Sequence, residues 1–319
     1  MVAGESVTLN DGHNDVMSEA SDIQAGDWID RQMPVWLRPY LRLARLDRPI
    51  GTWLLLFPCW WSLALAAPQG NLPDGQMLVL FALGAVVMRA AGCTVNDIVD
   101  RDFDAKVART ANRPLASGAL SLLQALMFLA LLLLVGLLIL VQFPLFAILL
   151  GAASLILVAA YPFMKRITWW PQAFLGLTFN WGALLGWAAD QGNLDQAPVW
   201  LYLGGISWTL FYDTIYAHQD KIDDALIGIK STALKLGTKT KPWLLVFAMV
   251  AIGCFAASLL VAGSGFIAFI ALVAILLHML WQTYDVDLDD AKDCLAKFRS
   301  NRFIGCIMFA GIVLDRLMG

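Results

Sequence analysis

Residues 96–104 concentrate side chains that bind cations, directly after a hydrophobic segment long enough to cross a membrane. These side chains are Asn96, Asp97, Asp100, Asp102 and Asp104. In a helix, Asn96, Asp100 and Asp104 recur at i, i+4 and i+8, so they stack on one face. Carboxylates this close repel one another unless a cation lies between them, and Mg2+ typically joins one or two carboxylates to substrate phosphates. The motif therefore predicts a diphosphate bound through Mg2+.

A second acidic cluster follows another apolar segment of spanning length, and it contains Asp213, Asp220, Asp223 and Asp224. Asp220 and Asp224 again have i, i+4 spacing. A single charge run is most often a solvated helix end. Two such clusters instead favour one diphosphate held between two metal ions.

A basic and aromatic stretch, residues 161–170, follows a further apolar segment. Tyr161 and Lys165 are four residues apart, so they share a helix face. Lys165 and Arg166 would neutralise charge on a leaving diphosphate, the electrostatic contribution that usually dominates catalysis. The alternative is that this stretch only marks the membrane interface.

Arg89 lies inside the apolar segment that precedes the first cluster. An arginine within a membrane is costly and marks a functional site whose partner must be found. Its planar guanidinium suits either one of the aspartates or the carboxylate of an acceptor substrate, and the sequence leaves both open. We expect His218 to be hydrogen-bonded at a helix end and not to be catalytic.

Hydrophobic helices must position these residues. The 319 residues are 59% hydrophobic and 15% charged, with a mean hydropathy of +0.68, which indicates a polytopic membrane protein. We therefore expect an all-α protein. Apolar runs of about 20 residues predict nine transmembrane helices, near 50–67, 76–96, 119–141, 144–163, 169–189, 197–218, 243–262, 264–284 and 303–317.

The basic residues predict the orientation, because Lys and Arg gather in cytoplasmic loops. The loops at 68–75, 141–144, 190–198 and 262–265 contain none of the 22 basic residues. Of those residues, only Arg316 is expected outside, and Arg89 lies within a span. We therefore expect the amino terminus and both acidic clusters at the cytoplasmic face, and the carboxyl terminus outside.

Three regions are expected. Residues 1–30 are acidic and resemble neither a signal peptide nor an Arg-rich transit peptide, so we predict a disordered cytoplasmic tail. Residues 31–49 are predicted to form an interfacial amphipathic helix, with Arg38, Arg42 and Arg45 facing lipid headgroups. Residues 50–319 form the nine-helix domain, and we expect it in a bacterial inner (plasma) membrane.

The polar motifs resemble those of the UbiA superfamily of intramembrane aromatic prenyltransferases. N-D-x-x-D-x-x-x-D matches at residues 96–104, D-x-x-x-D at 220–224 and Y-x-x-x-K at 161–165. The likeness extends from about Arg45 to the end of the chain. It implies a central cavity that opens to the cytoplasm, enclosed by the nine helices, with the isoprenoid tail lying in the bilayer.

The resemblance also implies roles for particular residues. The metal ligands would be Asn96, Asp100, Asp104, Asp220 and Asp224, with Mg2+ as the cofactor. The catalytic residues would be Asp100, Asp104, Asp213, Lys165 and Arg166. The substrate-binding residues would be Asn96, Asp97, Tyr161, Lys165, Arg48 and Arg89, the last two as candidates for an aromatic acid.

Segments such as NRPLASG and YPFMKRITWWPQ most resemble the branch of that family that acts on 4-hydroxybenzoate in ubiquinone biosynthesis. We therefore expect Mg2+-dependent transfer of a polyprenyl chain from its diphosphate to the ring carbon ortho to the phenol. The expected partners are polyprenyl diphosphate, 4-hydroxybenzoate and the lipid bilayer, and no nucleic acid.

Three alternatives compete with this function. One is a sibling prenyltransferase that acts on haem, a chlorophyllide or another quinone precursor. Another is a transporter, although the acidic residues gather at one membrane face and not along a path across it. A membrane phosphotransferase is the third, and its motif requires Gly where Arg101 follows Asp100.

Overall fold

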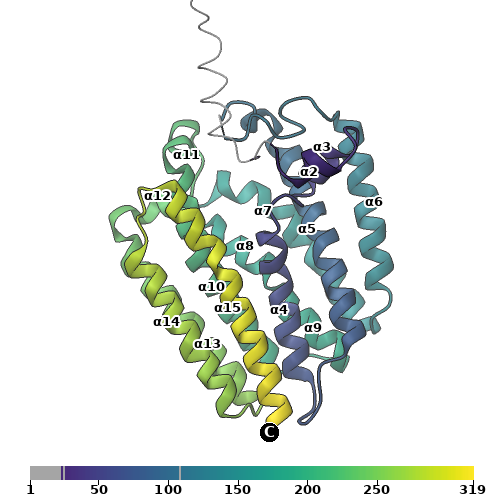
Figure 1. Ribbon diagram of the computed structural model, residues 1–319, viewed down its shortest axis with the longest axis vertical. Helices are drawn as coiled ribbons and strands as arrows, with labels where there is room; N and C mark the ends of the chain where they lie inside the picture. Colours follow the sequence, from purple (N-terminus) through teal and green to yellow (C-terminus); the bar gives the residue numbers. More distant parts are fainter. Residues whose placement is uncertain (1–22, 24–25, 108) are drawn as a thin grey trace, which may run out of the picture. The chain divides into compact units, whose positions relative to one another are not determined.

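A computed structural model describes residues 23, 26–107 and 109–319 of the chain, and these residues form helices and loops without any strand. The expected all-α class is therefore confirmed for this part of the chain. In chain order the elements (Figure 1) are α2 (Trp28–Gln32), α3 (Arg38–Leu43), α4 (Ile50–Ala66), α5 (Gly75–Asp104), α6 (Leu122–Leu140), α7 (Leu145–Ile167), α8 (Pro171–Phe179), α9 (Trp181–Gln191), α10 (Gln196–Ala217), η1 (His218–Asp220), α11 (Lys221–Ile227), α12 (Thr232–Leu236), η2 (Gly237–Lys239), α13 (Thr240–Val261), α14 (Phe266–Asp285) and α15 (Ala291–Met318).

The chain divides into two compact units. The smaller unit comprises residues 1–49 and 90–133, and the larger unit comprises residues 50–89 and 134–319. Helices α5 and α6 each contribute residues to both units. The first acidic motif belongs to the smaller unit, whereas the second motif, the basic stretch and Arg89 belong to the larger unit.

Several helices have membrane-spanning length and composition. Within the described residues, five segments meet both requirements, namely Gly75–Asp104, Leu122–Leu140, Leu145–Ile167, Thr232–Val261 and Phe266–Asp285. Helix α4 is apolar but shorter, with 17 residues. Each of the nine predicted spans falls on helical residues. The last of these helices, α15, begins well before the predicted residue 303.

The fifth predicted span, 169–189, consists of two helices, α8 and α9, which meet at Asn180. The buried Asn180 amide donates to the Gly176 carbonyl at 2.9 Å and to Thr209 Oγ1 at 2.8 Å. A side chain that binds a carbonyl four residues earlier competes with the backbone hydrogen bonds and bends a helix. Interrupted membrane helices are typical of substrate sites in transporters. Here the interruption follows Phe179, whose ring lies against the Arg89 guanidinium.

The expected single amphipathic helix over residues 31–49 is instead two short helices, α2 and α3. Pro34 separates them, because proline lacks an N–H and disfavours a helical residue before it. Arg42 of α3 pairs with Asp30 of α2 at 2.7 Å. Residues 1–22, 24 and 25 of the predicted acidic tail lie outside the described residues.

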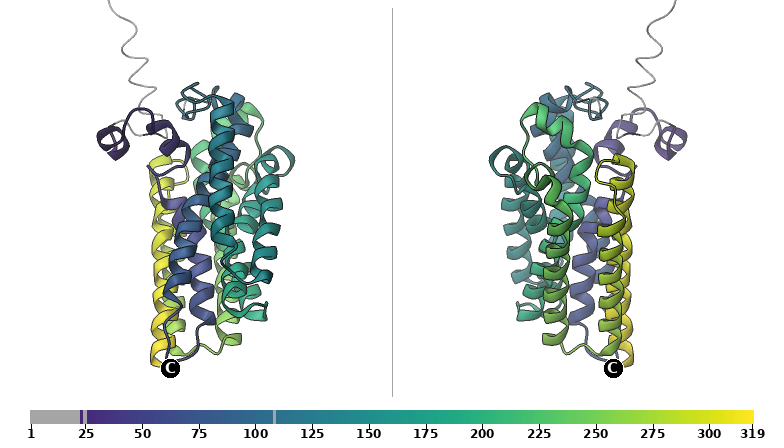
Figure 2. Two further views of the ribbon diagram at one scale, coloured as in Figure 1. Left: turned by 90° about the vertical axis from the view of Figure 1, so that its right-hand side faces the viewer. Right: turned by 90° about the vertical axis from the view of Figure 1, so that its left-hand side faces the viewer.

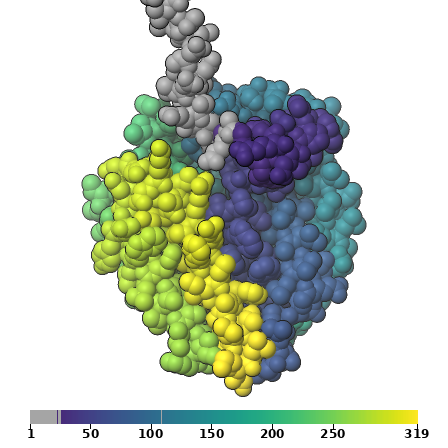
Figure 3. Space-filling view, in the orientation of Figure 1, coloured from purple at the N-terminus to yellow at the C-terminus, as the bar shows by residue number. Residues whose placement is uncertain are grey.

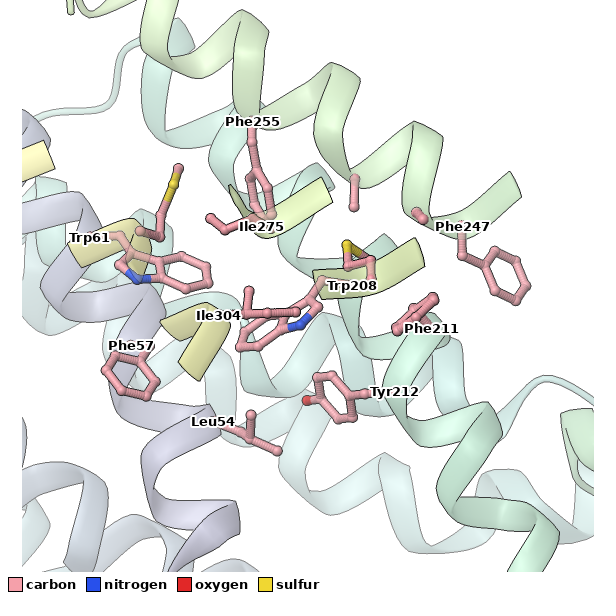
Figure 4. Packing of buried hydrophobic residues seen from close by; sticks show 14 of the residues in the cluster. Leu54, Phe57, Trp61, Trp208, Phe211, Tyr212, Phe247, Phe255, Ile275 and Ile304 are labelled. Atoms are coloured by element: carbon pink, nitrogen blue, oxygen red, sulfur yellow. The ribbon is translucent and has the colours of Figure 1, made fainter. Parts of the chain in front are cut away.

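The core of the larger unit is aromatic (Figure 4). Trp61 of α4 and Trp208 of α10 pack with ring centroids 5.1 Å apart, and Phe255 of α13 meets Trp61 edge-on. The indole N–H of Trp61 donates to the Gly305 carbonyl, and that of Trp208 donates to Asn301 Oδ1, each at 2.9 Å. Because a buried indole N–H needs a hydrogen-bond partner, these bonds fix α15 against α4 and α10.

Helices α14 and α15 pack against each other (Figures 1 and 2), and Figure 3 shows them on the surface of the larger unit. Near the end of α15, the buried Arg316 donates to the carbonyls of Leu65 and Ala262 at 2.8 and 2.9 Å. Its neighbour Asp315 accepts the Gly265 N–H before α14 at 2.6 Å. Arg316, the exception in the charge pattern, thus binds the C-terminal ends of α4 and α13, where a cation is favourable.

Candidate active site

The first acidic motif is the end of α5, which is helical without interruption as far as Asp104. The predicted helical stack is therefore confirmed. Asp97 and Asp100 are each 1% exposed, and Asp104 is 8% exposed. Asp102 instead points outward, with 80% of its side chain exposed, and pairs with Arg101. Helix α5 thus presents three carboxylates on one buried face.

Arg45, from the segment before α4, neutralises Asp97. Its Nη2 donates to both carboxylate oxygens, at 2.7 and 3.0 Å. The Arg45 backbone has a φ of 58°, a left-handed conformation that costs a non-glycine residue roughly 1–2 kcal/mol. The expectation that Arg45 faces lipid headgroups is therefore corrected, because its guanidinium is buried in this ion pair. Arg48, also expected to bind substrate, pairs with Asp47 at 3.1 Å.

Arg113, in the loop after α5, neutralises Asp104. Its Nη1 lies 2.9 Å from Asp104 Oδ2 and 3.5 Å from Asp97 Oδ1, so one nitrogen lies between two carboxylates. Thr110 folds this loop back onto the helix end, because its Oγ1 donates to the Asp104 carbonyl at 3.0 Å. The Thr110 carbonyl in turn accepts the Arg113 N–H at 2.9 Å. The local fold therefore delivers the guanidinium to the acidic face.

The same face suits a divalent cation that arrives with a phosphate ligand. Mg2+ takes oxygen ligands, commonly one or two carboxylates together with substrate phosphates. Asp100, Asp104 and the half-buried Asn96 supply such oxygens. Across the described residues, no three carboxylate, histidine or cysteine groups are arranged around a common metal position. The Arg113 guanidinium, held between two carboxylates, demonstrates that this face accommodates a positive charge.

The second acidic motif does not continue α10. Helix α10 ends before η1, Asp220 precedes α11, and Asp224 lies in the first turn of α11. The two aspartates keep their four-residue spacing, but across a helix boundary. His218 is buried at this boundary and forms a hydrogen bond with Thr240 Oγ1 at 3.1 Å. The prediction of a hydrogen-bonded histidine at a helix end is confirmed.

Lys221 joins the start of α11 to the loop before α15. Its ammonium group pairs with the Asp289 carboxylate and lies 3.5 Å from the Leu288 carbonyl oxygen. The hydrogen bond from Lys221 holds the pKa of the Asp289 carboxyl below its ordinary value. The ion pair therefore links the start of α11 to the loop between α14 and α15.

Lys165 and Arg166 occupy the last turn of α7, where the helix dipole favours cations. The loop after α11 is bonded to this turn, because the Lys230 N–H donates to the Lys165 carbonyl at 2.8 Å. The preceding Ile229 N–H donates to the Asp224 carbonyl at 2.9 Å. The structure therefore brings the end of α7, with its basic pair, next to the helix that carries Asp224.

Arg89 lies within the larger unit against an aromatic ring and a glycine. Its Cζ is 5.3 Å from the Phe179 ring centroid. A Cβ added at Gly51 would come within 2.5 Å of Arg89 Nε, so the guanidinium rests directly on the glycine backbone. This Nε has no hydrogen-bond partner among the described residues. Asp213 of α10 lies within electrostatic range of the guanidinium.

Tyr161 joins the same region from α7, where it is half-buried. Tyr161 and Arg89 both lie within electrostatic range of the buried Tyr212 of α10. Three predicted site residues, Tyr161, Arg89 and Asp213, from three helices of the larger unit, thus all lie within electrostatic range of Tyr212.

The sequence profile of the UbiA prenyltransferase family matches residues 55–309 of the chain. The chain belongs to the UbiA prenyltransferase family. Rat mitochondrial 4-hydroxybenzoate polyprenyltransferase is 55% identical to it over 284 residues, which are 88% of this chain and 75% of the rat protein.

Solved structures of UbiA homologues share the fold. The apo structure of a UbiA homologue from Aeropyrum pernix K1 covers 83% of this chain and 97% of its own, with a TM-score of 0.70 and 25% identity. A UbiA homologue from Archaeoglobus fulgidus bound to GPP and Mg2+ covers 88% of this chain and 100% of its own, with a TM-score of 0.64 and 18% identity.

These comparisons contradict the predicted location in a bacterial inner membrane. The rat relative is described as mitochondrial, and relatives from Arabidopsis thaliana and Homo sapiens, at 51% and 55% identity, carry the same description. The charge pattern separates one face of a membrane from the other, but it does not identify the membrane.

Three cationic partners of this UbiA chain were not predicted, namely Arg45, Arg113 and Lys221. Their partners lie 52, 9 and 68 positions away in the chain, respectively. Buried carboxylates such as Asp97 and Asp104 require cations, whereas the Asp289 side chain that pairs with Lys221 is 85% exposed. Which basic residue serves each carboxylate depends on how the loops fold back.

Proposed function

We propose that this chain transfers a polyprenyl group from polyprenyl diphosphate to the ring carbon of 4-hydroxybenzoate ortho to the phenol, in ubiquinone biosynthesis. Its identity to the rat 4-hydroxybenzoate polyprenyltransferase supports this reaction and acceptor. The observation that carries the chemistry is the buried face of α5, where three carboxylates lie together and guanidinium groups pair with two of them.

The diphosphate is proposed to bind through Mg2+ to both acidic motifs. The proposed ligands are Asn96, Asp100, Asp104, Asp220 and Asp224. Bound Mg2+ withdraws charge from the diphosphate oxygens and so weakens the allylic C–O bond. The oxygen-rich face of α5 supports this choice, as does the Mg2+ in the A. fulgidus homologue. Asp97 contributes through Arg45, which it holds at the motif.

The leaving group is proposed to pair with the end of α7. Lys165 and Arg166 add their charges to the phosphate oxygens as the C–O bond breaks, and their position in the last helical turn keeps both cations at that end. Tyr161 lies on the same helix face as Lys165 and is proposed to contribute its phenolic hydroxyl to substrate binding. The bonds from the loop after α11 to this turn support a shared role for the basic pair and Asp224.

The acceptor is proposed to bind at Arg89. A guanidinium and a carboxylate form a strong charge-assisted pair, and this guanidinium already rests on the Phe179 ring, against which an aromatic acid can pack. Arg48 is the second candidate for the carboxylate. Asp213, within range of the Arg89 charge, is proposed to take up the proton that the ring releases.

The reaction is an electrophilic aromatic substitution. The bond between the allylic carbon and the diphosphate oxygen breaks, and its electron pair leaves with the diphosphate. The ring carbon ortho to the phenol then bonds to the allylic carbon and loses its proton. Aromatic side chains stabilise the allylic cation and exclude water, which would otherwise capture it.

The nine predicted spans are proposed to cross the bilayer around a central cavity, with the prenyl tail among the lipids. Each predicted span falls on helical residues, which supports this number. Only 6% of the most apolar 18-residue stretch of α6 is buried, as expected for a helix that faces lipid.

The decisive experiment incubates membranes containing the protein with 4-hydroxybenzoate, prenyl diphosphates of several lengths and Mg2+, with EDTA as a control. Mass spectrometry identifies the product. Asp100→Asn and Asp220→Asn are expected to abolish transfer while the protein still inserts. Asp102→Asn, on the exposed side of α5, is the matched control and is expected to retain transfer. Near-normal transfer by both active-site variants would contradict the metal-bound diphosphate.

A further inference from the structure

We propose that Arg113 is an exchangeable counter-ion, which binds Asp104 before the metal arrives and leaves Asp104 when a divalent cation binds. This inference rests on the proposed function, in which Asp104 is a metal ligand. It adds a residue of the loop after α5 to the events of metal binding, although arginine itself is not a metal ligand.

The geometry places Arg113 where the cation must bind. Its Nη1 donates to Asp104 Oδ2 at 2.9 Å, and the same nitrogen lies 3.5 Å from Asp97 Oδ1. A metal ion that takes Oδ2 as a ligand therefore competes directly with the guanidinium. The charges of Asp97 and Asp100 also act on Asp104, so the carboxylate needs a cation in either state.

The two ion pairs of the motif differ in how exposed their side chains are. Arg45 contacts both oxygens of Asp97, and the side chains of this pair are 8% and 1% exposed. Arg113 donates to Oδ2 of Asp104, and the side chains of that pair are 13% and 11% exposed. Asp104 is also the more exposed of the two carboxylates and is the proposed metal ligand, whereas Asp97 is not. Arg113 is therefore the exchangeable partner, and Arg45 is the fixed one.

Exchange has a consequence that a purely structural contact lacks. A residue that only stabilises the motif would weaken metal binding when it is removed. A competitor for the Asp104 oxygen would strengthen metal binding when it is removed. A charge that acts only through space would also strengthen binding, but it would do so whether or not Asp104 is a carboxylate.

The first test measures Mn2+ binding by electron paramagnetic resonance, with the full chain in lipid nanodiscs and no diphosphate. Arg113→Gln is expected to bind Mn2+ about tenfold more tightly than wild type, because one charge-assisted hydrogen bond no longer competes. In an Asp104→Asn background, the same substitution is expected to change the affinity by no more than about twofold. Arg101→Gln, on the exposed side of the same helix, is the matched control.

The second test uses the wild-type protein, so it remains decisive if Arg113→Gln fails to fold. Phenylglyoxal labels accessible guanidinium groups, and peptide mass spectrometry quantifies the label at each arginine. Added Mn2+ is expected to increase labelling of Arg113 and to leave Arg101 unchanged.

Each outcome has a distinct meaning. A tighter Arg113→Gln site only when Asp104 is present, or Mn2+-dependent labelling of Arg113, supports exchange. Three results overturn exchange but leave the proposed function standing. They are an equal gain in Mn2+ affinity in both backgrounds, no gain in affinity, and labelling of Arg113 that does not change when Mn2+ is added. A wild-type protein that binds no Mn2+ without diphosphate also overturns exchange by the metal alone, whereas the proposed function fails only if transfer itself proves independent of Mg2+.

Discussion

The ion pair between Arg45 and Asp97 is expected to be a major contribution to the stability of the smaller unit. Arg45→Gln removes two short hydrogen bonds, at 2.7 and 3.0 Å, from a carboxylate that is 1% exposed. The nearest remaining cationic atom that the structure places beside it is Arg113 Nη1 at 3.5 Å. Removing one partner of a buried ion pair costs about 3–5 kcal/mol, because the other charge remains buried. We expect a loss of that order in the free energy of unfolding.

The double variant tests whether the lost stability comes from the unpaired charge of Asp97 or from the loss of the Arg45 side chain itself. Arg45→Gln/Asp97→Asn removes both charges and leaves no buried carboxylate without its cation, so we expect it to regain most of the lost stability. The assay is thermal unfolding in detergent micelles, followed by intrinsic fluorescence. Arg101→Gln breaks the exposed pair with Asp102 on the same helix and is expected to change stability by less than about 0.5 kcal/mol. The reasoning is refuted if Arg45→Gln is as stable as this control, or if the double variant is less stable than the single one.

Three further perturbations test other parts of the structure. Gly51→Ala is expected to raise the KM for 4-hydroxybenzoate about tenfold with little change in kcat, because the new Cβ would come within 2.5 Å of Arg89 Nε; an unchanged KM in steady-state assays would contradict an acceptor site there. Arg316→Gln is expected to cost on the order of 2 kcal/mol in thermal unfolding, because two charged bonds to helix-end carbonyls are lost; equal melting temperatures would show that the caps contribute nothing. Lys221→Met is expected to lower kcat, and Lys221→Arg to restore it, because the loop before α15 holds the second motif through this cation; equal rates for the two variants would exclude a positioning role.

The positions of the helices and of the first motif followed from local features. Hydrophobic runs identified helical residues for all nine predicted spans, and the four-residue spacing correctly placed Asp100 and Asp104 on one face of α5. Helical periodicity depends on backbone geometry over a few residues, so a sequence pattern is enough to predict it. The predicted helix over residues 31–49 is instead divided at Pro34, and the fifth span is divided at Asn180, whose side-chain amide binds the Gly176 carbonyl.

The residues alone were enough to establish that this protein consists of helices of membrane-spanning composition and carries two acidic clusters with four-residue spacing, because hydrophobic length and charge spacing are local properties. The pairing of each cation with its carboxylate came from the folded chain, because Arg45 lies 52 positions from Asp97 and Arg113 lies 9 positions from Asp104. A buried carboxylate must find some cation. Which cation it finds depends on the folding of loops that the spacing of the motif does not describe.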